Sequence, residues 1–171
     1  MLARAVEHVS DARADLTPFV QRVFETIGFA KVSTSAANAA ELGFLRDADA
    51  ITMNRERQIA DAKAIALERA REGYKPLGPR TAIPVGGDNL LAALKLGVHL
   101  AWRAGRLSDH DALLGRTLAW VLCGGSLPHQ TTVTEQYLLD LEREAFLKLC
   151  GERKTLERIQ HTLKTGKPLR N

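Results

Sequence analysis

Four segments in the second half of the sequence repeat apolar residues at the three- and four-residue spacing of an α-helix. They cover about 88–105, 108–125, 132–151 and 153–165, and glycine or proline stops each of them. Helices joined by such short turns pack as antiparallel neighbours. This pattern predicts a helix bundle, and it leaves little sequence for a sheet.

Each segment opens on a residue suited to cap a helix. Asp88 is expected to cap the first, Ser108 with Asp111 forms a capping-box variant in the second, and Thr132 with Glu135 forms a capping box in the third. The side chains expected to face inward are Leu90, Leu91, Leu94, Val98, Ala101, Trp102, Leu114, Leu118, Val121, Leu122, Leu138, Leu141, Ala145, Phe146, Leu149, Leu156, Ile159 and Leu163.

The first half also indicates helices, with less regular punctuation. We expect helices over 2–10 and 17–27, a short one capped by Ser33 or Ser35 and ending near Leu42, and a long one over 55–72 capped by Asn54. Only 50–53 suits a strand, and one strand makes no sheet. The fold class is therefore predicted to be all-α, with at most one short strand.

A linker is expected over 73–87, because four glycines and three prolines fall within these fifteen residues. Such a composition should exclude regular structure. The predicted organisation is a helical region over 1–72, the linker over 73–87, and a four-helix region over 88–171.

The composition is that of an ordinary globular domain, with 171 residues, 45% hydrophobic and 26% charged residues. No apolar run reaches the roughly 18 residues that span a bilayer. The amino-terminal residues do not resemble a secretory signal, and two cysteines outside any CxxC pair favour the cytoplasm.

The formal charge of +4 lies entirely in 152–171, which hold six basic and two acidic residues. This tail has no aromatic side chain on which a base could stack, so nucleic-acid binding is not expected.

No residue pattern points to a reaction. Gly86-Gly87 before a helix is interpreted as a turn, because Asp88 would repel a phosphate and no GxGxxG or GxxxxGK[ST] is present. The five histidines form no metal-ligand spacing, and His99 is expected to be a partly buried, hydrogen-bonded side chain. Cys123 and Cys150 are expected to be small buried residues. We predict no catalytic residue and no metal site.

The sequence nevertheless resembles a known family. The run TEQYLLDLEREAFLKLCGERKTLERIQHTLKTGKPLRN is similar to the carboxyl end of bacterial multifunctional β-oxidation proteins. These proteins join a 3-hydroxyacyl-CoA dehydrogenase to a crotonase-like enoyl-CoA hydratase. The late crotonase phrase AxxAxxxGL(V) is similar to Ala36, Ala39, Ala40 and Gly43-Phe44-Leu45, and the resemblance covers about 20–171. It implies that 1–72 is the helical end of the crotonase-like core region.

The resemblance implies a part without the family's reaction centre. The oxyanion hole and paired glutamates of the hydratase, and the GxGxxG turn and His/Glu pair of the dehydrogenase, have no counterpart in this sequence. No cofactor is therefore expected in this chain, since NAD would belong to the dehydrogenase region. The resemblance implies that a CoA thioester is a possible ligand, with Lys164 and Lys167 as weak candidates to meet the CoA phosphates.

The resulting hypothesis is a C-terminal helical part of a fatty-acid β-oxidation enzyme that is not catalytic alone. We expect acyl-CoA as a possible partner, and a homo-oligomer or association with the rest of the enzyme, because helices lacking their packing surface expose apolar faces. One alternative is a helical oligomerisation or interaction module without acyl-CoA binding. Another is an unrelated helical enzyme whose site assembles across distant helices.

Overall fold

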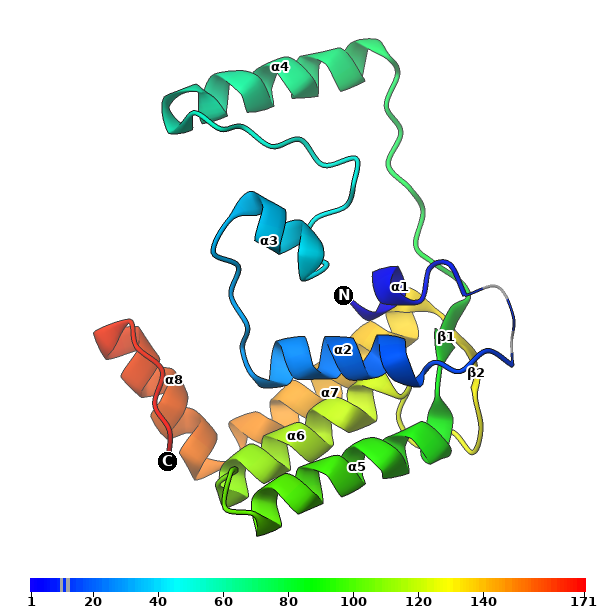
Figure 1. Cartoon of the computed structure of the whole chain (residues 1–171), viewed down its shortest axis with the longest axis vertical. Coiled ribbons are helices and arrows are strands. Elements are labelled where there is room, and N and C mark those ends of the chain that lie inside the picture. The colour runs from blue at the N-terminus through cyan, green and yellow to red at the C-terminus, as the bar shows by residue number, and fades with distance from the viewer. Residues whose placement is uncertain (10, 12) are drawn as a thin grey trace. The chain divides into compact units, whose positions relative to one another are not determined.

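The computed structural model describes residues 1–9, 11 and 13–171, and these residues are mainly helical (Figure 1). The helices are α1 (Leu2–Ala5), α2 (Thr17–Gly28), α3 (Ala36–Glu41), α4 (Gln58–Arg71), α5 (Gly87–Arg103), α6 (Asp109–Leu122), α7 (Glu135–Cys150) and α8 (Arg153–Thr165), with a 3-10 turn η1 (Arg55–Arg57) before α4. The predicted all-α class is confirmed. No helix in the described residues combines the length and apolar character needed to cross a membrane.

The structure divides into two compact units, which are described separately. The first contains Met1–Lys31 together with Arg80–Asn171, and the second contains Val32–Pro79. One boundary between the units falls inside the predicted linker at 73–87. The predicted assignment of 1–72 to the end of a crotonase-like core stays a prediction.

The core of the first unit lies where α5 and α6 pack against each other and α2 packs against α6. This core joins two stretches that are far apart in the sequence, since Val20 and Val23 of α2 lie in one cluster with Ala119 and Leu122 of α6. The cluster also contains Leu2, Val6, Leu16, Ile83, Val85, Leu90, Leu91, Leu94 and Cys123. Burial of these apolar side chains is what holds the unit together.

A two-stranded antiparallel sheet closes one side of this core. It consists of β1 (Ile83–Val85) and β2 (Thr131–Val133), with Pro84 opposite Thr132. The predicted strand at 50–53 was wrong, because those residues form no strand. The expectation that no regular element survives in 73–87 was also wrong: Ile83 and Val85 are 2% and 0% exposed, so burial offsets the unfavourable composition.

Several predicted helix boundaries are confirmed and others need correction. Ser35 caps α3, Asn54 caps η1, and Ser108 and Asp111 form a complete capping box on α6. Residues 17–27 and 153–165 form α2 and α8 as expected. The predicted helix 2–10 extends only over Leu2–Ala5, and its last residue, Ser10, lies outside the described residues.

Two predicted caps were wrong. The cap position of α5 is Gly86, two residues before the predicted Asp88, so Asp88 lies in the first turn of the helix instead of capping it. Thr132 lies in β2, and Thr134 caps α7 by accepting a hydrogen bond from the Tyr137 amide. In both places a strand next to the helix decides where the helix starts. The apolar spacing within the helix does not indicate that such a strand is present.

The inward face predicted for α5 is confirmed at four of six positions, since Ala101 and Trp102 are only partly buried, and the one predicted for α8 is wrong. Leu90, Leu91, Leu94 and Val98 are buried. On α8 the three apolar side chains are exposed, Leu156 by 51%, Ile159 by 38% and Leu163 by 83%, and Phe146 of α7 is 59% exposed. The helical period identified these faces as apolar, but packing among the described residues leaves their side chains exposed.

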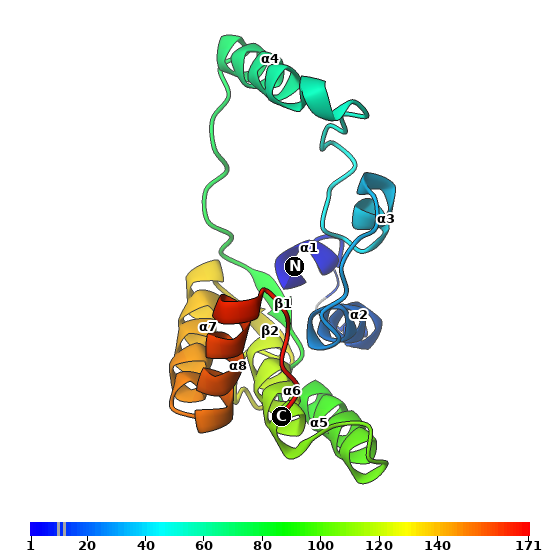
Figure 2. The ribbon, with the colours of Figure 1, turned by 90° about the vertical axis from the view of Figure 1, so that its left-hand side faces the viewer.

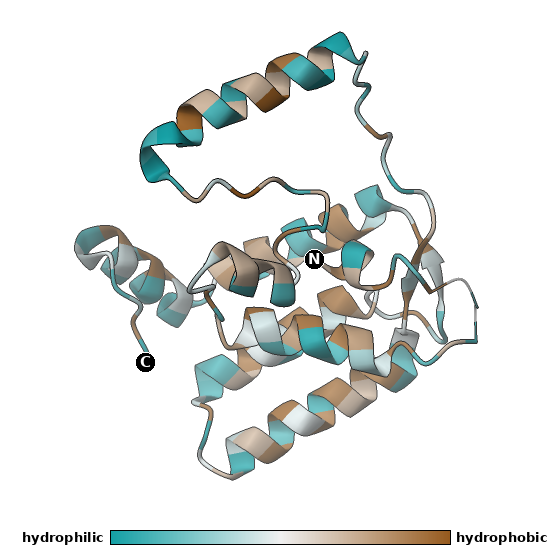
Figure 3. Cartoon of the chain, turned by 45° about the horizontal axis from the view of Figure 1, so that its top comes forward, coloured by the Kyte–Doolittle hydropathy of each residue, from teal (hydrophilic) through white to brown (hydrophobic). Residues whose placement is uncertain are grey.

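The second unit has little apolar core. Its helices are α3 and α4, and no residue of α4 is buried. Figure 3 shows hydrophobic and hydrophilic residues interspersed along α4. Large apolar side chains are mostly exposed here, among them Val32, Ile51, Met53, Ile59, Leu67 and Leu77.

Candidate functional site

The two lysines singled out from the sequence lie at the carboxyl end of α8. Lys164 occupies the last helical turn, and Lys167 follows Gly166, whose φ of +68° ends the helix in the left-handed conformation. The backbone around Lys167 is fixed by Thr165, whose hydroxyl accepts from the Lys167 amide at 3.2 Å. Both lysines are exposed. Their role in CoA binding stays a prediction.

A polar cluster at the opposite end of α8 was not predicted. Figure 2 shows the chain after α8 returning along that helix, and the C-terminus lying beside α6. We call this cluster the α6–α8 junction. It contains Ser108, His110, Asp111, Thr155, Glu157, Arg158 and Asn171.

An ion pair and the last residue connect the elements of the junction. Arg158 Nη2 lies 2.8 Å from Asp111 Oδ1, and both side chains are largely shielded from solvent. Arg158 Nε also donates to Asn171 Oδ1 at 2.8 Å, and Asn171 Nδ2 donates to Glu157 Oε2 at 2.9 Å. The Ser108 hydroxyl, besides capping α6, donates to the backbone oxygen of Asn171 at 3.2 Å. The junction therefore ties α8 and the tail to the start of α6.

His110 is the buried titratable group of the junction. It is 4% exposed, and its Nε2 lies 3.1 Å from the hydroxyl of Thr155. Burial lowers the pKa of His110, the charges of Arg158 and Lys154 lower it further, and Asp111 and Glu152 oppose this effect. The imidazole is consequently neutral at neutral pH.

Asp111 is held in its charged form. Burial alone would raise the pKa of Asp111, but hydrogen bonds from Arg158 and Ser108 outweigh it and bring the pKa below its usual value. The carboxylate therefore keeps its ion pair over the whole physiological range. Because His110 is buried, we interpret the junction as a structural connection and not as a reaction centre.

The sequence showed only the local part of the junction. The capping box of Ser108 and Asp111 is visible as a spacing of three residues. The contact between His110 and Thr155 joins positions 45 residues apart, and that of Ser108 and Asn171 joins positions 63 apart. A single sequence holds no signal for such pairs.

The turn interpretation of Gly86-Gly87 fits the backbone. Gly87 has a φ of +63°, and its amide donates to the carbonyl oxygen of Cys123 at 3.1 Å. The amide of Asp88 donates to the carbonyl oxygen of Leu127 at 2.8 Å. These two amides are already satisfied by the protein, so they are not available to cradle a phosphate.

Cys123 is an unreactive core residue, as predicted. It is fully buried, and burial raises the pKa of its thiol to about 12, so the nucleophilic thiolate does not form. Cys150 is only partly buried, which corrects the expectation that both are buried. His99 is exposed rather than partly buried, and its ring lies 5.6 Å from the Trp102 ring.

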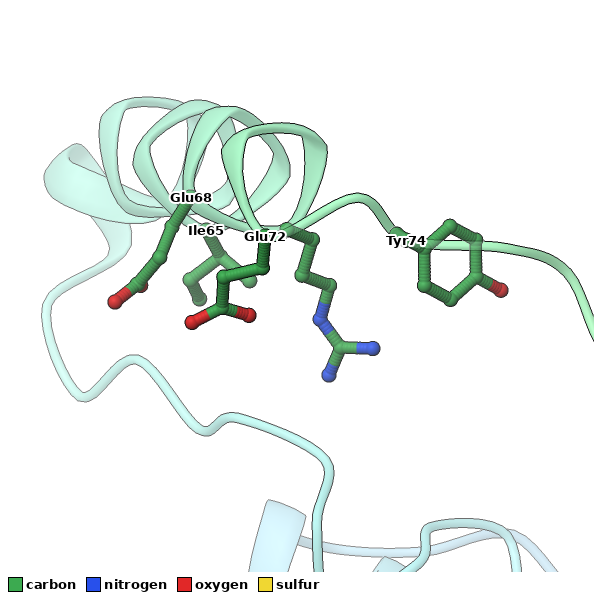
Figure 4. A pocket seen from close by; sticks show the side chains of 5 residues that line it. Ile65, Glu68, Glu72 and Tyr74 are labelled. Carbon is green, nitrogen blue, oxygen red and sulfur yellow. The ribbon is translucent and has the colours of Figure 1, made fainter.

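Other features of the described residues supply no site chemistry. An open depression on α4 is lined by Ile65, Glu68, Arg69, Glu72 and Tyr74. Figure 4 shows Ile65, Glu68 and Glu72 on the helix and Tyr74 on the segment that follows it. No group of three or more His, Cys, Asp or Glu side chains able to hold a metal occurs in the part of the chain that the structure describes.

Comparison with known proteins gives one informative similarity. No family model matches the chain, and no solved structure gives a significant match. The chain is 43% identical over 150 residues to a Bacillus subtilis protein named "Probable 3-hydroxyacyl-CoA dehydrogenase". The match covers 88% of this chain and 19% of that protein. The chain is thus related by sequence to about one fifth of a protein named as a 3-hydroxyacyl-CoA dehydrogenase.

Proposed function

We propose that the chain is the C-terminal helical part of a fatty-acid β-oxidation enzyme that joins 3-hydroxyacyl-CoA dehydrogenase and enoyl-CoA hydratase activities. The similarity to the Bacillus protein supports this proposal, since 43% identity extends over 88% of the chain. The helical character of the described residues is in keeping with such a part. We further propose that it works in the cytoplasm, where acyl-CoA metabolism would supply its ligand.

On its own, the chain catalyses neither reaction in this proposal. The matched region is 19% of the relative's length, and the sequence contains no GxGxxG turn to hold a dinucleotide. In this proposal NAD binds elsewhere in the larger assembly, and the chain supports that assembly. It does so as a homo-oligomer or in association with the rest of the β-oxidation enzyme.

An assay of the isolated chain tests the absence of catalysis. Crotonyl-CoA hydration and NAD-dependent oxidation of 3-hydroxybutyryl-CoA would be followed with the chain alone, and with the Bacillus relative as a parallel sample. We expect no turnover above background from the chain. Turnover in either assay would contradict the proposal.

Contact with CoA is the second part of the proposal. A lysine ammonium binds phosphate as a point charge, and Lys164 and Lys167 are exposed at the end of α8. Titration calorimetry with CoA should give saturable binding that the double variant Lys164→Ala/Lys167→Ala weakens by about tenfold, the effect of two solvent-exposed ion pairs.

The control variant removes the same number of positive charges from a different part of the chain. The double variant Lys63→Ala/Lys75→Ala removes two exposed lysines from the second unit and should leave CoA binding unchanged. Equal losses in both double variants would indicate a nonspecific charge effect and would overturn the assignment to α8.

The exposed apolar side chains favour one alternative, a helical oligomerisation or interaction module without acyl-CoA binding. Phe146 is 59% and Leu163 is 83% exposed in a chain otherwise able to build a core. Light scattering coupled to gel filtration, together with the CoA titration, distinguishes the interaction module from the part that binds CoA. A stable oligomer without CoA binding supports the alternative, whereas CoA binding supports the first proposal.

A further inference from the structure

We propose that the α6–α8 junction is a pH-sensitive connection: protonation of His110 releases α8 and the tail after it from α6, while the rest of the first unit stays folded.

Helix α8 packs against α7 but contributes no buried residue, and polar contacts tie it to α6. No residue of α8 is buried, and its apolar side chains Leu156 and Leu163 are more than half exposed. Two direct polar contacts connect the helix to α6, the hydrogen bond between Thr155 and His110 and the ion pair between Arg158 and Asp111. Asn171 adds a bridge from α8 to Ser108. Loss of either contact should therefore loosen α8 far more than the well-packed α5 and α6.

His110 occupies a position in α6 that disfavours a positive charge. The helix starts at Asp109, so His110 lies in the first turn, where the positive end of the helix dipole disfavours a further positive charge. Burial to 4% exposure adds the cost of removing a charge from water.

The charged groups that face His110 come from both helices and from the turn before α8. Arg158 and Lys154 of α8 disfavour the imidazolium, while Asp111 of α6 and Glu152 before α8 favour it. Asp109 is also in the first turn, but it accepts a hydrogen bond from the Trp102 indole. Burial and the cations outweigh the two carboxylates and lower the pKa of His110. Protonation therefore places an unfavourable positive charge between α6 and the cations of α8.

The sign of the effect follows from linkage. The unfolded or released state binds a proton at the ordinary histidine pKa of 6.5, and the attached state does so at a lower pH. The contribution of neutral His110 is thus complete above pH 6.5 and is lost as the pH falls below it. Asp111 does not reverse this trend, because the pKa of its carboxyl is lowered and it remains charged.

Hydrogen exchange followed by mass spectrometry tests the proposal on the whole chain at pH 7.5 and pH 5.5, with rates corrected for intrinsic exchange. We expect the protection of 153–165 to fall measurably and by at most about tenfold, the limit for one linked proton over one pH unit below 6.5. Protection of 109–122 and 135–150 should remain nearly constant. An equal loss in all three helices would show general unfolding and would overturn the proposal.

Two histidine variants make the test specific. His110→Gln cannot be protonated, so protection of α8 should no longer depend on pH. His129→Gln, at an exposed position in the loop before β2, should retain the behaviour of the unaltered chain. A pH dependence that persists in His110→Gln would contradict the assignment.

A direct titration remains decisive if His110→Gln fails to fold. The imidazole C2 proton of His110 in the unaltered chain reports its protonation by nuclear magnetic resonance. The α8 amide signals should change over the same pH interval as this proton. If they change over a different interval, or do not change, His110 does not control the attachment of α8.

Discussion

At the scale of single residues, the most demanding position is Gly87, where backbone conformation and close packing coincide. Its φ is +63°, and a Cβ there would lie 2.5 Å from the carbonyl oxygen of His129. Gly105 has nearly the same φ of +70°, but nothing lies within 4 Å of the corresponding position. Substitution of Gly105 therefore measures the free-energy cost of the left-handed backbone alone. Substitution of Gly87 measures that cost together with the steric clash.

We predict that Gly105→Ala lowers the free energy of unfolding by about 1 kcal/mol, the cost of placing a side chain in the left-handed region. Gly87→Ala should lower it by at least about 2 kcal/mol more, because a backbone carbonyl cannot move aside cheaply. Urea unfolding followed by circular dichroism measures both. Similar losses in the two variants would show that the carbonyl contact is unimportant.

At the scale of the elements, α7 shows how far the sequence leads and where it stops. The apolar period of α7 and its end before Gly151 could be predicted, because local spacing and a stop residue encode them. Its first residue could not. Thr132 and Thr134 are both good caps, and only the pairing of Thr132 with Pro84 in the sheet distinguishes them.

We predict that Thr134→Ala lowers the free energy of unfolding by about 1 kcal/mol, because the Tyr137 amide loses its hydrogen-bond acceptor. Thr132→Ala, at an exposed strand position, should change it by less than about 0.5 kcal/mol. Thermal unfolding of both variants in the same buffer gives the comparison. A larger loss for Thr132→Ala would favour the cap predicted from sequence.

In the candidate site, too, features set by local sequence could be predicted and long-range contacts could not. Lys164 and Lys167 are adjacent to each other because they are close in sequence, and a resemblance to a family was enough to single them out. His110 and Arg158 belong to different helices, and their partnership arises only from how α6 and α8 pack. Long-range polar contacts of this kind require coordinates.

At the scale of the whole molecule, the first unit combines two stretches of sequence separated by the second unit. Residues 72–79 connect α4 to the first unit and are all exposed. They include Tyr74, which is 60% exposed, so chymotrypsin should cut here early.

We predict that protein cut by chymotrypsin after Tyr74 still elutes as one species in gel filtration. The pieces stay together because Val20 and Val23 on one side of the cut share a core with Ala119 and Leu122 on the other. Denaturing electrophoresis of the same fraction should show separate fragments. Elution as separate pieces would contradict the shared core.

This shared core also constrains how the protein is made. Roughly 100 residues separate α2 from the α6 residues against which it packs. At about 5–20 residues per second, the ribosome needs roughly 5–20 s to bridge that interval. During this interval the apolar side of α2 stays uncovered, so α2 is a segment at which the cell's chaperones can bind the growing chain.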